Sequence, residues 1–521
     1  MQDSHGRLAT YLNPVYSRSF PDPFILKFRG EYFAYSTGFA PDGKVFMTLR
    51  SSDLVTWTEI GGAMTPLPDS PPFYWAPEVS YSNGKFYLYY SVGNETFMEI
   101  RLAISGRPDG GFTDSGTKLT SEDFAIDAHV FLDQDGTRYF FYATDFLEHS
   151  HIGTGTVVDR MVDWKTLEGN SHPVTRAKYD WQVYDHNRKE KGGVRWHTVE
   201  GPAVLKRKGL YYEMFSGGNW QNTTYGVSFA IADSLERGDE WAQFSDGVNV
   251  LPVLRTIPGV VDGPGHNSVV RGPNNRELYC VYHRWVDGAR VLAIDRMDFA
   301  GDRIFVVGPT NAPQPLPLPP SIRERFIGRI SSDRIAIRGD WRFDKQGIVS
   351  VADGRCEMRL ETISQSFLLE LTLAFSDIAA AGGDAGVIFE TASASATINL
   401  DLTRRSVEIA SNATSRTFDF PPELDWTADH FVRIECDHRW FRIKVDDLIV
   451  CPWSMLEAPV DRITIFSENS PLMMGSLELT EGFEELFEDD TALEDNGWSF
   501  QSGGNYQRAP GEIRFHERDF R

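Results

Sequence analysis

The sequence predicts an all-β protein that consists of an N-terminal five-bladed β-propeller followed by a C-terminal β-sandwich. Three observations lead to this prediction: one hairpin pattern recurs five times before residue 311, a proline-rich stretch precedes residue 320, and short strands with turn signals dominate after it. The chain has 521 residues, 41% of them hydrophobic. That length and composition allow two to four domains with well-filled cores.

The recurring pattern is a polar or acidic lead-in, a short apolar strand, a Gly or Asn turn, and an aromatic strand. Its copies begin at Pro21, Ala76, Ile126, Val199 and His266. Strand periodicity on both sides of a turn is typical of a hairpin. A spacing of roughly 50 to 70 residues suits the four-stranded blades of a propeller. Because the innermost strands of a propeller converge on its axis, we expect the five lead-ins to meet there.

The boundary between the two domains is the stretch from Asn311 to Pro320, NAPQPLPLPP. Its alternating prolines disfavour helix and central strand and indicate an extended connector. We therefore expect the propeller over residues 1–311, the linker over 312–320 and the sandwich over 321–521. The strands predicted in the sandwich include FLLELTLAF, AGVIFETAS, HFVRIECD and GSLELTEG.

The end of the chain repeats part of the sandwich. The segment GDWRFDKQGIVSVADGRCEMRL is echoed by NGWSFQSGGNYQRAPGEIRF, with Trp341 to Gly354 and Trp498 to Gly511 at the same separation. Either the sandwich's opening hairpin is repeated, or a further, truncated module begins at about residue 484. A chance echo of a Gly-Trp pair is the third interpretation.

Charge narrows the range of binding partners. The net charge of −23 opposes nucleic acid and anionic membrane surfaces, because the long-range field repels them. A neutral or cationic ligand fits better. Aromatic residues make up 13% of the chain, and flat rings stack well on sugars. Aromatic side chains also favour β-sheet, which accounts for most of them without any ligand.

The cysteines and the N-terminus give little indication of a specialised environment. Four cysteines are too few for a disulfide framework, and none has the spacing of metal ligands. We expect buried thiols at Cys280, Cys356, Cys436 and Cys451. The first residues lack the apolar core of a signal peptide, and no segment is apolar enough for a membrane span. This favours a cytoplasmic protein, or a secreted protein whose signal peptide has been removed.

Three carboxylates, Asp22, Asp127 and Glu200, lie at lead-ins of different copies. Hydrolysis of a glycosidic bond needs one protonated carboxyl for the leaving oxygen and one ionised carboxylate that activates water. A third carboxyl tunes or orients the acid. Asp22 is held stiffly between Pro21 and Pro23, as suits an oriented base. Asp127 has apolar neighbours, so its charge requires a partner.

Four motifs occur in the order seen in glycoside hydrolase family 43, which the chain resembles over roughly residues 15 to 310. They are PDPF at Pro21, WAPE at Trp75, IDAHVF at Ile126 and VEGP at Val199. The resemblance implies a five-bladed propeller and inversion of anomeric configuration. It also implies that Asp22 is the general base, Glu200 the general acid, and Asp127 the residue that raises the pKa of the acid and orients it.

The resemblance also indicates His266, in GPGHNS, as an axial histidine that contacts substrate or helps to hold calcium through water. A single His after Gly is otherwise typical of a turn. Glu78 lies two residues beyond Ala76, the match of Asp22, and is expected to be structural. Further candidates for the pocket wall or for stacking on a sugar are the aromatic residues Trp75, Phe39 and Trp220. Arg284 and Arg296 are candidates for hydrogen bonds to sugar hydroxyls, although surface salt bridges are the commoner role of such arginines.

The family's activities favour removal of α-L-arabinofuranosyl units, with β-D-xylosyl as the second choice, from plant cell-wall polysaccharide or oligosaccharide. No residue distinguishes the two sugars, the linkage, exo from endo attack, or the oligomeric state. A retaining fructan hydrolase is disfavoured, because such enzymes resemble Asn-Asp-Pro-Asn with Glu-Cys-Pro. A non-catalytic carbohydrate-binding propeller is the other alternative, but binding alone does not need opposed carboxylates.

The sandwich either braces the propeller or binds polysaccharide, and the first role is preferred. Its tryptophans occupy strand positions that suit a core as well as a ligand surface: Trp341, Trp440, Trp453 and Trp498.

Overall fold

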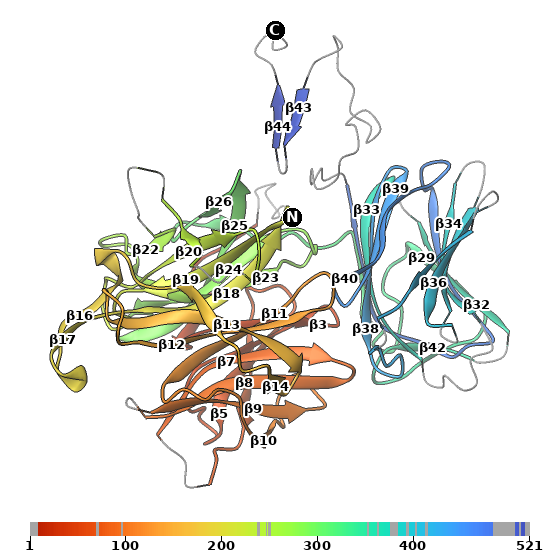
Figure 1. Ribbon diagram of the computed structural model, residues 1–521. Helices are drawn as coiled ribbons and strands as arrows, with labels where there is room; N and C mark the ends of the chain where they lie inside the picture. Colours follow the sequence, from red (N-terminus) through yellow and green to blue (C-terminus); the bar gives the residue numbers. More distant parts are fainter. Residues whose placement is uncertain are drawn as a thin grey trace. The chain divides into compact units, whose positions relative to one another are not determined.

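The computed structural model describes most of the chain between residues 9 and 482. The described residues exclude 69–71, 95–96, 237–239, 246, 248–251, 352–353, 362–363, 376–383, 392–394, 402–403, 412–414 and 422, and include 506–509 and 512–515 near the C-terminus. The prediction of an all-β protein is confirmed (Figure 1). The chain divides into two compact units, residues 1–133 with 137–318 and residues 134–136 with 319–521.

In the N-terminal unit, five sheets of at least four strands are the blades, and each repeat forms the first two strands of one blade, which pair antiparallel. The first blade is β3 (Phe24–Phe28), β4 (Glu31–Tyr35), β5 (Val45–Ser51) and β6 (Thr58–Met64). The second is β7 (Phe73–Ser82), β8 (Lys85–Gly93), β9 (Met98–Ser105) and β10 (Thr113–Lys118). The third is built on β11 (Ala125–Leu132), β12 (Arg138–Phe146) and β13 (Gly153–Asp163), with β14 (Thr166–Leu167) and β15 (His172–Thr175).

The fourth blade is β18 (Val199–Arg207), β19 (Leu210–Gly217), β20 (Gly226–Ala232), β21 (Ala242–Gln243) and β22 (Leu254–Arg255). The fifth is β23 (Asp262–Arg271), β24 (Leu278–Val286), β25 (Ala289–Ala300) and β26 (Arg303–Val306). Strand β2 (Tyr16–Ser19) pairs with β25, so the two ends of the unit meet in one sheet. Strand β1 (Thr10–Tyr11) pairs in turn with β27 (Gln314–Pro315), inside the proline-rich stretch.

The same backbone shape recurs where the chain enters each blade. Residues Asp22, Ala76, Asp127, Gly201 and His266 have φ angles of 51°, 42°, 60°, 59° and 49°. Four of the five are not glycine, although side chains disfavour this left-handed region. In the second to fifth blades the register of the first two strands shifts at this point, as in a β-bulge. Such a bulge redirects the side chain, so the repeated backbone presents five side-chain positions near the axis.

An additional hairpin follows β15 in the sequence and precedes the fourth blade. It comprises η1 (Asp180–Gln182), β16 (Val183–Arg188), η2 (Lys189–Lys191) and β17 (Val194–His197). Strand β17 pairs with β13 in parallel at Gly153 and His197. The hairpin therefore belongs to the third blade and ends immediately before the strand that carries Glu200.

Aromatic side chains fill the space between neighbouring blades. One buried cluster joins Phe141 of the third blade to Phe215 and Trp241 of the fourth. Another joins Tyr212 and Phe229 of the fourth blade to Tyr282 of the fifth. Removing these large rings from water stabilises the contacts between blades. Packing against neighbours thus accounts for much of the aromatic content.

The C-terminal unit has two antiparallel sheets that share one hydrophobic core, as a sandwich does. The first sheet contains β28 (Ile322–Glu324), β30 (Trp341–Phe343), β31 (Ile348–Ser350), β33 (Ser366–Phe375), β38 (His430–Asp437), β39 (Trp440–Val445), β40 (Leu448–Met455) and β42 (Leu472–Glu481). The second contains β29 (Ile335–Arg338), β32 (Arg355–Glu361), β34 (Asp384–Glu390), β35 (Ser395–Asp401), β36 (Ser406–Ser411), β37 (Ser415–Asp419) and β41 (Arg462–Glu468). Trp341 is part of the core, whereas Trp440 and Trp453 are half-buried.

Near the C-terminus, β43 (Tyr506–Ala509) and β44 (Glu512–Phe515) pair with each other. Trp498 and Gly511, on which the predicted repeat depends, lie outside the described residues. In the repeated sequence, β43 and β44 correspond to β31 and β32, which lie in different sheets. This hairpin therefore does not reproduce the pairing that opens the sandwich, and an extra module from about residue 484 stays a prediction.

The four cysteines are buried free thiols. Among the residues that the structure describes, no helix has the length and apolar character needed to span a membrane.

Candidate active site

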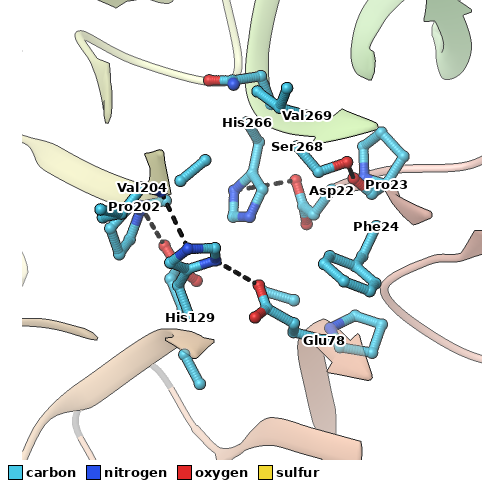
Figure 2. Close-up of a pocket in the computed structure, with 17 residues that line it drawn as sticks. Asp22, Pro23, Phe24, Glu78, His129, Pro202, Val204, His266, Ser268 and Val269 are labelled. Atoms are coloured by element: carbon cyan, nitrogen blue, oxygen red, sulfur yellow. Dashed lines mark hydrogen bonds and ion pairs between the residues drawn. The ribbon is translucent and has the colours of Figure 1, made fainter. Parts of the chain in front are cut away.

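The three predicted acids come from the entries of the first, third and fourth blades. Asp22 and Asp127 line the same axial cavity of about 60 Å³, together with Gly201 and His266 (Figure 2). The backbone N–H of Gly201, the residue after Glu200, donates to Asp127 Oδ2 over 3.0 Å. The fold thus gathers side chains that are separated by up to 244 positions in the sequence.

Asp22 is surrounded by groups that favour its ionised form. Arg290 Nη1 lies 2.9 Å from Asp22 Oδ1, and His266 Nδ1 lies 3.6 Å from the same oxygen. His283 Nδ1 accepts the backbone N–H of Asp22 over 3.2 Å. Burial alone raises the pKa of Asp22, but the Arg290 charge, with His266 and His283, outweighs it and holds the pKa well below its ordinary value. The carboxylate is therefore ionised at neutral pH.

Glu200 has the opposite environment. Among the described residues, one side-chain hydrogen bond reaches Glu200: the Tyr225 hydroxyl donates to Oε1 over 2.7 Å. Burial and the negative charge of Asp22 raise the pKa of Glu200 to about 7, although Tyr225, Arg290 and Arg188 act in the other direction. Glu200 is consequently a carboxyl that keeps a proton near neutral pH.

Asp127 is 5% exposed and interacts electrostatically with both of the other acids. Burial, followed by the charges of Glu200 and Asp22, raises the pKa of Asp127 well above its ordinary value. Its backbone N–H donates to Ser91 Oγ over 3.0 Å. The partner that the apolar sequence context required is a backbone N–H, that of Gly201, rather than a cation. Asp127 and Glu200 therefore form a coupled pair that shares a proton near neutral pH.

His266 lies beside the base, and its backbone N–H donates to Ser216 Oγ over 2.8 Å. Calcium requires six to eight oxygen ligands. The described part of the chain contains no group of three or more His, Cys, Asp and Glu side chains able to hold a metal ion. The one acid beside His266, Asp22, is already paired with Arg290. These residues do not fit a protein-ligated calcium, and an ion held through water stays a prediction.

Trp220, predicted to form part of the pocket wall, packs against Arg290, the residue that pairs with Asp22. The guanidinium of Arg290 is 4.4 Å from the centre of the Trp220 ring. Trp285 stacks on Trp220 with ring centres 6.4 Å apart and donates from Nε1 to its carbonyl oxygen over 2.8 Å. The two tryptophans fix one face of Arg290, and through it the position of Asp22.

Trp75 and Phe39 lie around the start of the second blade. The Trp75 ring packs on Phe73, with 5.2 Å between ring centres, and against the cluster that contains Ile126, the neighbour of Asp127. Phe39 is 55% exposed and contacts the ring of Tyr74 at 5.7 Å. Both remain candidates for contact with substrate.

Arg284 and Arg296 make their contacts elsewhere. Arg284 is 3% exposed and donates from Nη1 to the carbonyl oxygen of Thr310 over 3.2 Å. Successive side chains of a strand point to opposite faces, and the face of β24 toward Asp22 is taken by His283. Arg296 pairs with Asp298 at 3.2 Å and Glu277 at 3.8 Å. It is six positions along β25 from Arg290, or about 20 Å at the rise of a strand.

Figure 2 also shows His129 between Glu78 and Val204, part of a network that links three blades. Glu78 Oε1 accepts the backbone N–H of Val130 over 2.8 Å, and His129 Nε2 accepts that of Val204 over 2.9 Å. Because Nε2 of His129 is an acceptor, Nδ1 carries the hydrogen and donates to Glu78 Oε2 over 2.9 Å. These contacts agree with the structural role expected for Glu78.

Comparisons with known proteins identify a family. The profile described as "Glycosyl hydrolases family 43" matches residues 11–305. Beta-D-galactofuranosidase xynD of Aspergillus niger is 32% identical over 313 residues, which are 55% of this chain and 82% of the relative. An extracellular exo-alpha-(1->5)-L-arabinofuranosidase of Streptomyces chartreusis is 28% identical over 302 residues, 53% of this chain and 83% of the relative. A crystal structure of a thermostable family-43 glycoside hydrolase is 32% identical, with a TM-score of 0.52, covering 59% of this chain and 99% of that one.

Proposed function

The chain belongs to glycoside hydrolase family 43, and we propose that it is an exo-acting, inverting glycosidase that releases α-L-arabinofuranosyl units from plant cell-wall polysaccharide or its oligosaccharides. The observation that carries this proposal is the contrast between two partly buried carboxyls at one axis. Asp22 is held ionised by Arg290, whereas Glu200 has a pKa of about 7 and keeps a proton. Inverting hydrolysis requires this pair of opposite states.

In the proposed reaction, Glu200 donates its proton to the leaving glycosidic oxygen. Asp22 accepts a proton from water, which attacks the anomeric carbon from the opposite face of the sugar. Asp127 holds the backbone at Gly201, next to Glu200, and as the ionised member of the pair it keeps the shared proton on Glu200. The Tyr225 hydroxyl, by donating to Glu200 Oε1, orients the carboxyl and leaves Oε2 to carry the proton. The stiff backbone between Pro21 and Pro23 holds Asp22 in one orientation, so that the activated water is directed at the anomeric carbon.

The choice of a furanosyl unit is supported by the names of the relatives, a galactofuranosidase and an arabinofuranosidase. The β-D-galactofuranosyl and α-L-arabinofuranosyl rings share their ring configuration and differ by one CHOH unit on the exocyclic arm. A site that accepts one of these rings accepts the other if the pocket for the exocyclic arm is deeper or shallower by one CHOH unit. The second candidate is therefore a β-D-galactofuranosidase, and β-D-xylosyl, a pyranosyl unit, ranks third.

The cellular location of the protein is also inferred from these relatives. The Streptomyces chartreusis relative is named extracellular. Polymeric cell-wall substrate lies outside the cell, so we favour the secreted alternative over the cytoplasmic one.

The proposal is tested with three nitrophenyl glycosides: α-L-arabinofuranoside, β-D-galactofuranoside and β-D-xylopyranoside. We expect the highest kcat/KM on the arabinofuranoside and a measurable value on the galactofuranoside. A maximum on the galactofuranoside selects the second candidate. Turnover of the xyloside alone, or of none of the three, contradicts the proposed furanosidase. The Glu200→Gln variant serves as the control for contaminating activity.

A further inference from the structure

The hairpin of β16 and β17 borders the candidate site on the side of the proton donor. The backbone N–H of Thr198 donates to the Gln182 carbonyl over 2.8 Å, directly before the strand of Glu200. Asn219 Nδ2 donates to the Tyr184 carbonyl over 3.0 Å, which ties the hairpin to the loop carrying Trp220. The hairpin is therefore fastened both to the strand of Glu200 and to the aromatic support of Arg290.

Within this hairpin, Arg188 is positioned by two aromatic rings. Its guanidinium carbon lies 4.9 Å from the ring centre of Tyr184 and 4.9 Å from that of Trp196. Stacking occupies the faces of the guanidinium plane and leaves its N–H edge for a ligand. The described residues offer this edge no ion pair or side-chain hydrogen bond, and the side chain is half-buried.

The neighbouring cations of the hairpin differ in this respect. Lys191 lies 4.9 Å from the same Trp196 ring, but its Nζ is paired with Asp145 at 2.7 Å. Arg195 is paired with Asp180 at 2.7 Å. Arg188 is thus a prearranged guanidinium without an anion among the described residues, whereas Lys191 and Arg195 of the same hairpin each have one.

Charge on the hairpin also differs from that of the whole chain. Residues 183–197 contain four basic and two acidic side chains, whereas the chain carries a net charge of −23. Because Lys191 and Arg195 are already paired with Asp145 and Asp180, the positive charge that attracts an anion at this hairpin is that of Arg188. The charge of Arg188 acts on Glu200 and lowers its pKa, which opposes proton retention by the donor. When a bound substrate places an anion at Arg188, the anion offsets the Arg188 charge, so that this charge no longer lowers the pKa of Glu200.

We propose that Arg188 forms the leaving-group subsite and that the preferred leaving group carries a carboxylate, as a uronic acid residue does. The planar guanidinium edge matches the two oxygens of a carboxylate. The carboxylate also neutralises the cation beside Glu200. This inference rests on the proposed function, because it assigns a substrate class to the same site.

The test uses two disaccharides that differ in one group. In the first, an α-L-arabinofuranosyl unit is linked to a uronic acid; in the second, the carboxylate is reduced to the alcohol. We expect kcat/KM to be about 10- to 100-fold higher for the acid, the range for a hydrogen bond to a charged group. Arg188→Gln should abolish this preference, and Arg188→Lys should retain part of it. Arg195→Gln, in the same hairpin, is the matched control and should keep the full preference.

Two results overturn the inference: equal kcat/KM for both disaccharides with the unaltered protein, or an equal loss on both with Arg188→Gln. Binding of both disaccharides to Glu200→Gln, measured by calorimetry, separates the two proposals. Preferential binding of the acid without turnover by the unaltered protein supports the subsite and contradicts the furanosidase. Turnover of both disaccharides without preference does the reverse.

Discussion

At the scale of single residues, the site depends on how neighbours set the protonation of similar groups. Asp22 and Glu200 are both partly buried carboxyls near one axis. Arg290 lies 2.9 Å from the first, whereas the second receives a neutral phenol. The difference in charge between these two neighbours, rather than the chemistry of the carboxyls, divides base from acid.

The first prediction concerns these two side chains. Asp22→Asn and Glu200→Gln should each lower kcat by about 10²- to 10⁴-fold on a natural oligosaccharide, because each removes one proton transfer. Both replacements conserve size, so the melting temperature should change little. Activity assays and thermal denaturation of the same preparations check this. Near-normal turnover by either variant would remove the assigned role.

The second prediction is the pH dependence of kcat/KM. The proton donor works only while it is protonated, and the pKa of Glu200 is raised to about 7. Activity should therefore fall as pH rises through about 7, whereas the acidic limb, set by Asp22, should lie below the ordinary range of an aspartate. Asp127→Asn removes a negative charge and should move the alkaline limb to lower pH. A profile that stays flat well above pH 7 contradicts the assignment of the donor.

Asp22, Asp127 and Glu200 were predictable because each lies at, or next to, the same place in a repeated sequence pattern. Arg290, His283 and Tyr225 were not. They lie on or beside the second and third strands of blades, where the repeat gives no register toward the axis. Arg284, adjacent to His283, was a plausible candidate from composition alone, but one step along a strand reverses the direction of a side chain.

At the scale of structural elements, the blades need links other than strand pairing at the axis. The Glu78–His129 network supplies such a link between β7, β11 and β18. The sequence indicated that Glu78 was out of step with the acids. The bulge between Trp75 and Glu78 is the physical reason, since it sets Ala76 rather than Glu78 at the repeated position.

The third prediction tests this network. Glu78→Ala leaves the partly buried His129 and the N–H of Val130 without their acceptor, and should lower the free energy of unfolding by about 2–5 kcal/mol. Glu59→Ala is the control, because Glu59 pairs with Arg18 at the surface and should contribute less than about 1 kcal/mol. Urea denaturation measures both. Equal, small losses in the two variants would contradict a linking role for Glu78.

At the scale of the whole molecule, the repeat and the proline-rich stretch together predicted the blade architecture and the presence of a separate all-β unit. Two features could not be predicted from the repeat or from the proline-rich stretch. The hairpin of β16 and β17 is an insertion, and the repeat describes only the first two strands of a blade. The pairing of β2 with β25 joins segments about 275 residues apart, and no local pattern marks such partners.

The fourth prediction concerns metal. Because the described residues around His266 do not form a set of calcium ligands, treatment with a chelator followed by dialysis should leave the melting temperature and kcat unchanged. Differential scanning calorimetry and the arabinofuranoside assay of the full chain check this. A loss that calcium restores and magnesium does not would support an ion held through water at His266.

The central claim is that Asp22 and Glu200 act on opposite faces of the sugar, and the stereochemistry of the product tests it most directly. Proton NMR of the first-formed sugar, recorded during hydrolysis of nitrophenyl α-L-arabinofuranoside before mutarotation, identifies the anomer released. We predict the β-anomer, which corresponds to inversion by one water activated by Asp22. First release of the α-anomer, with retained configuration, would contradict the account.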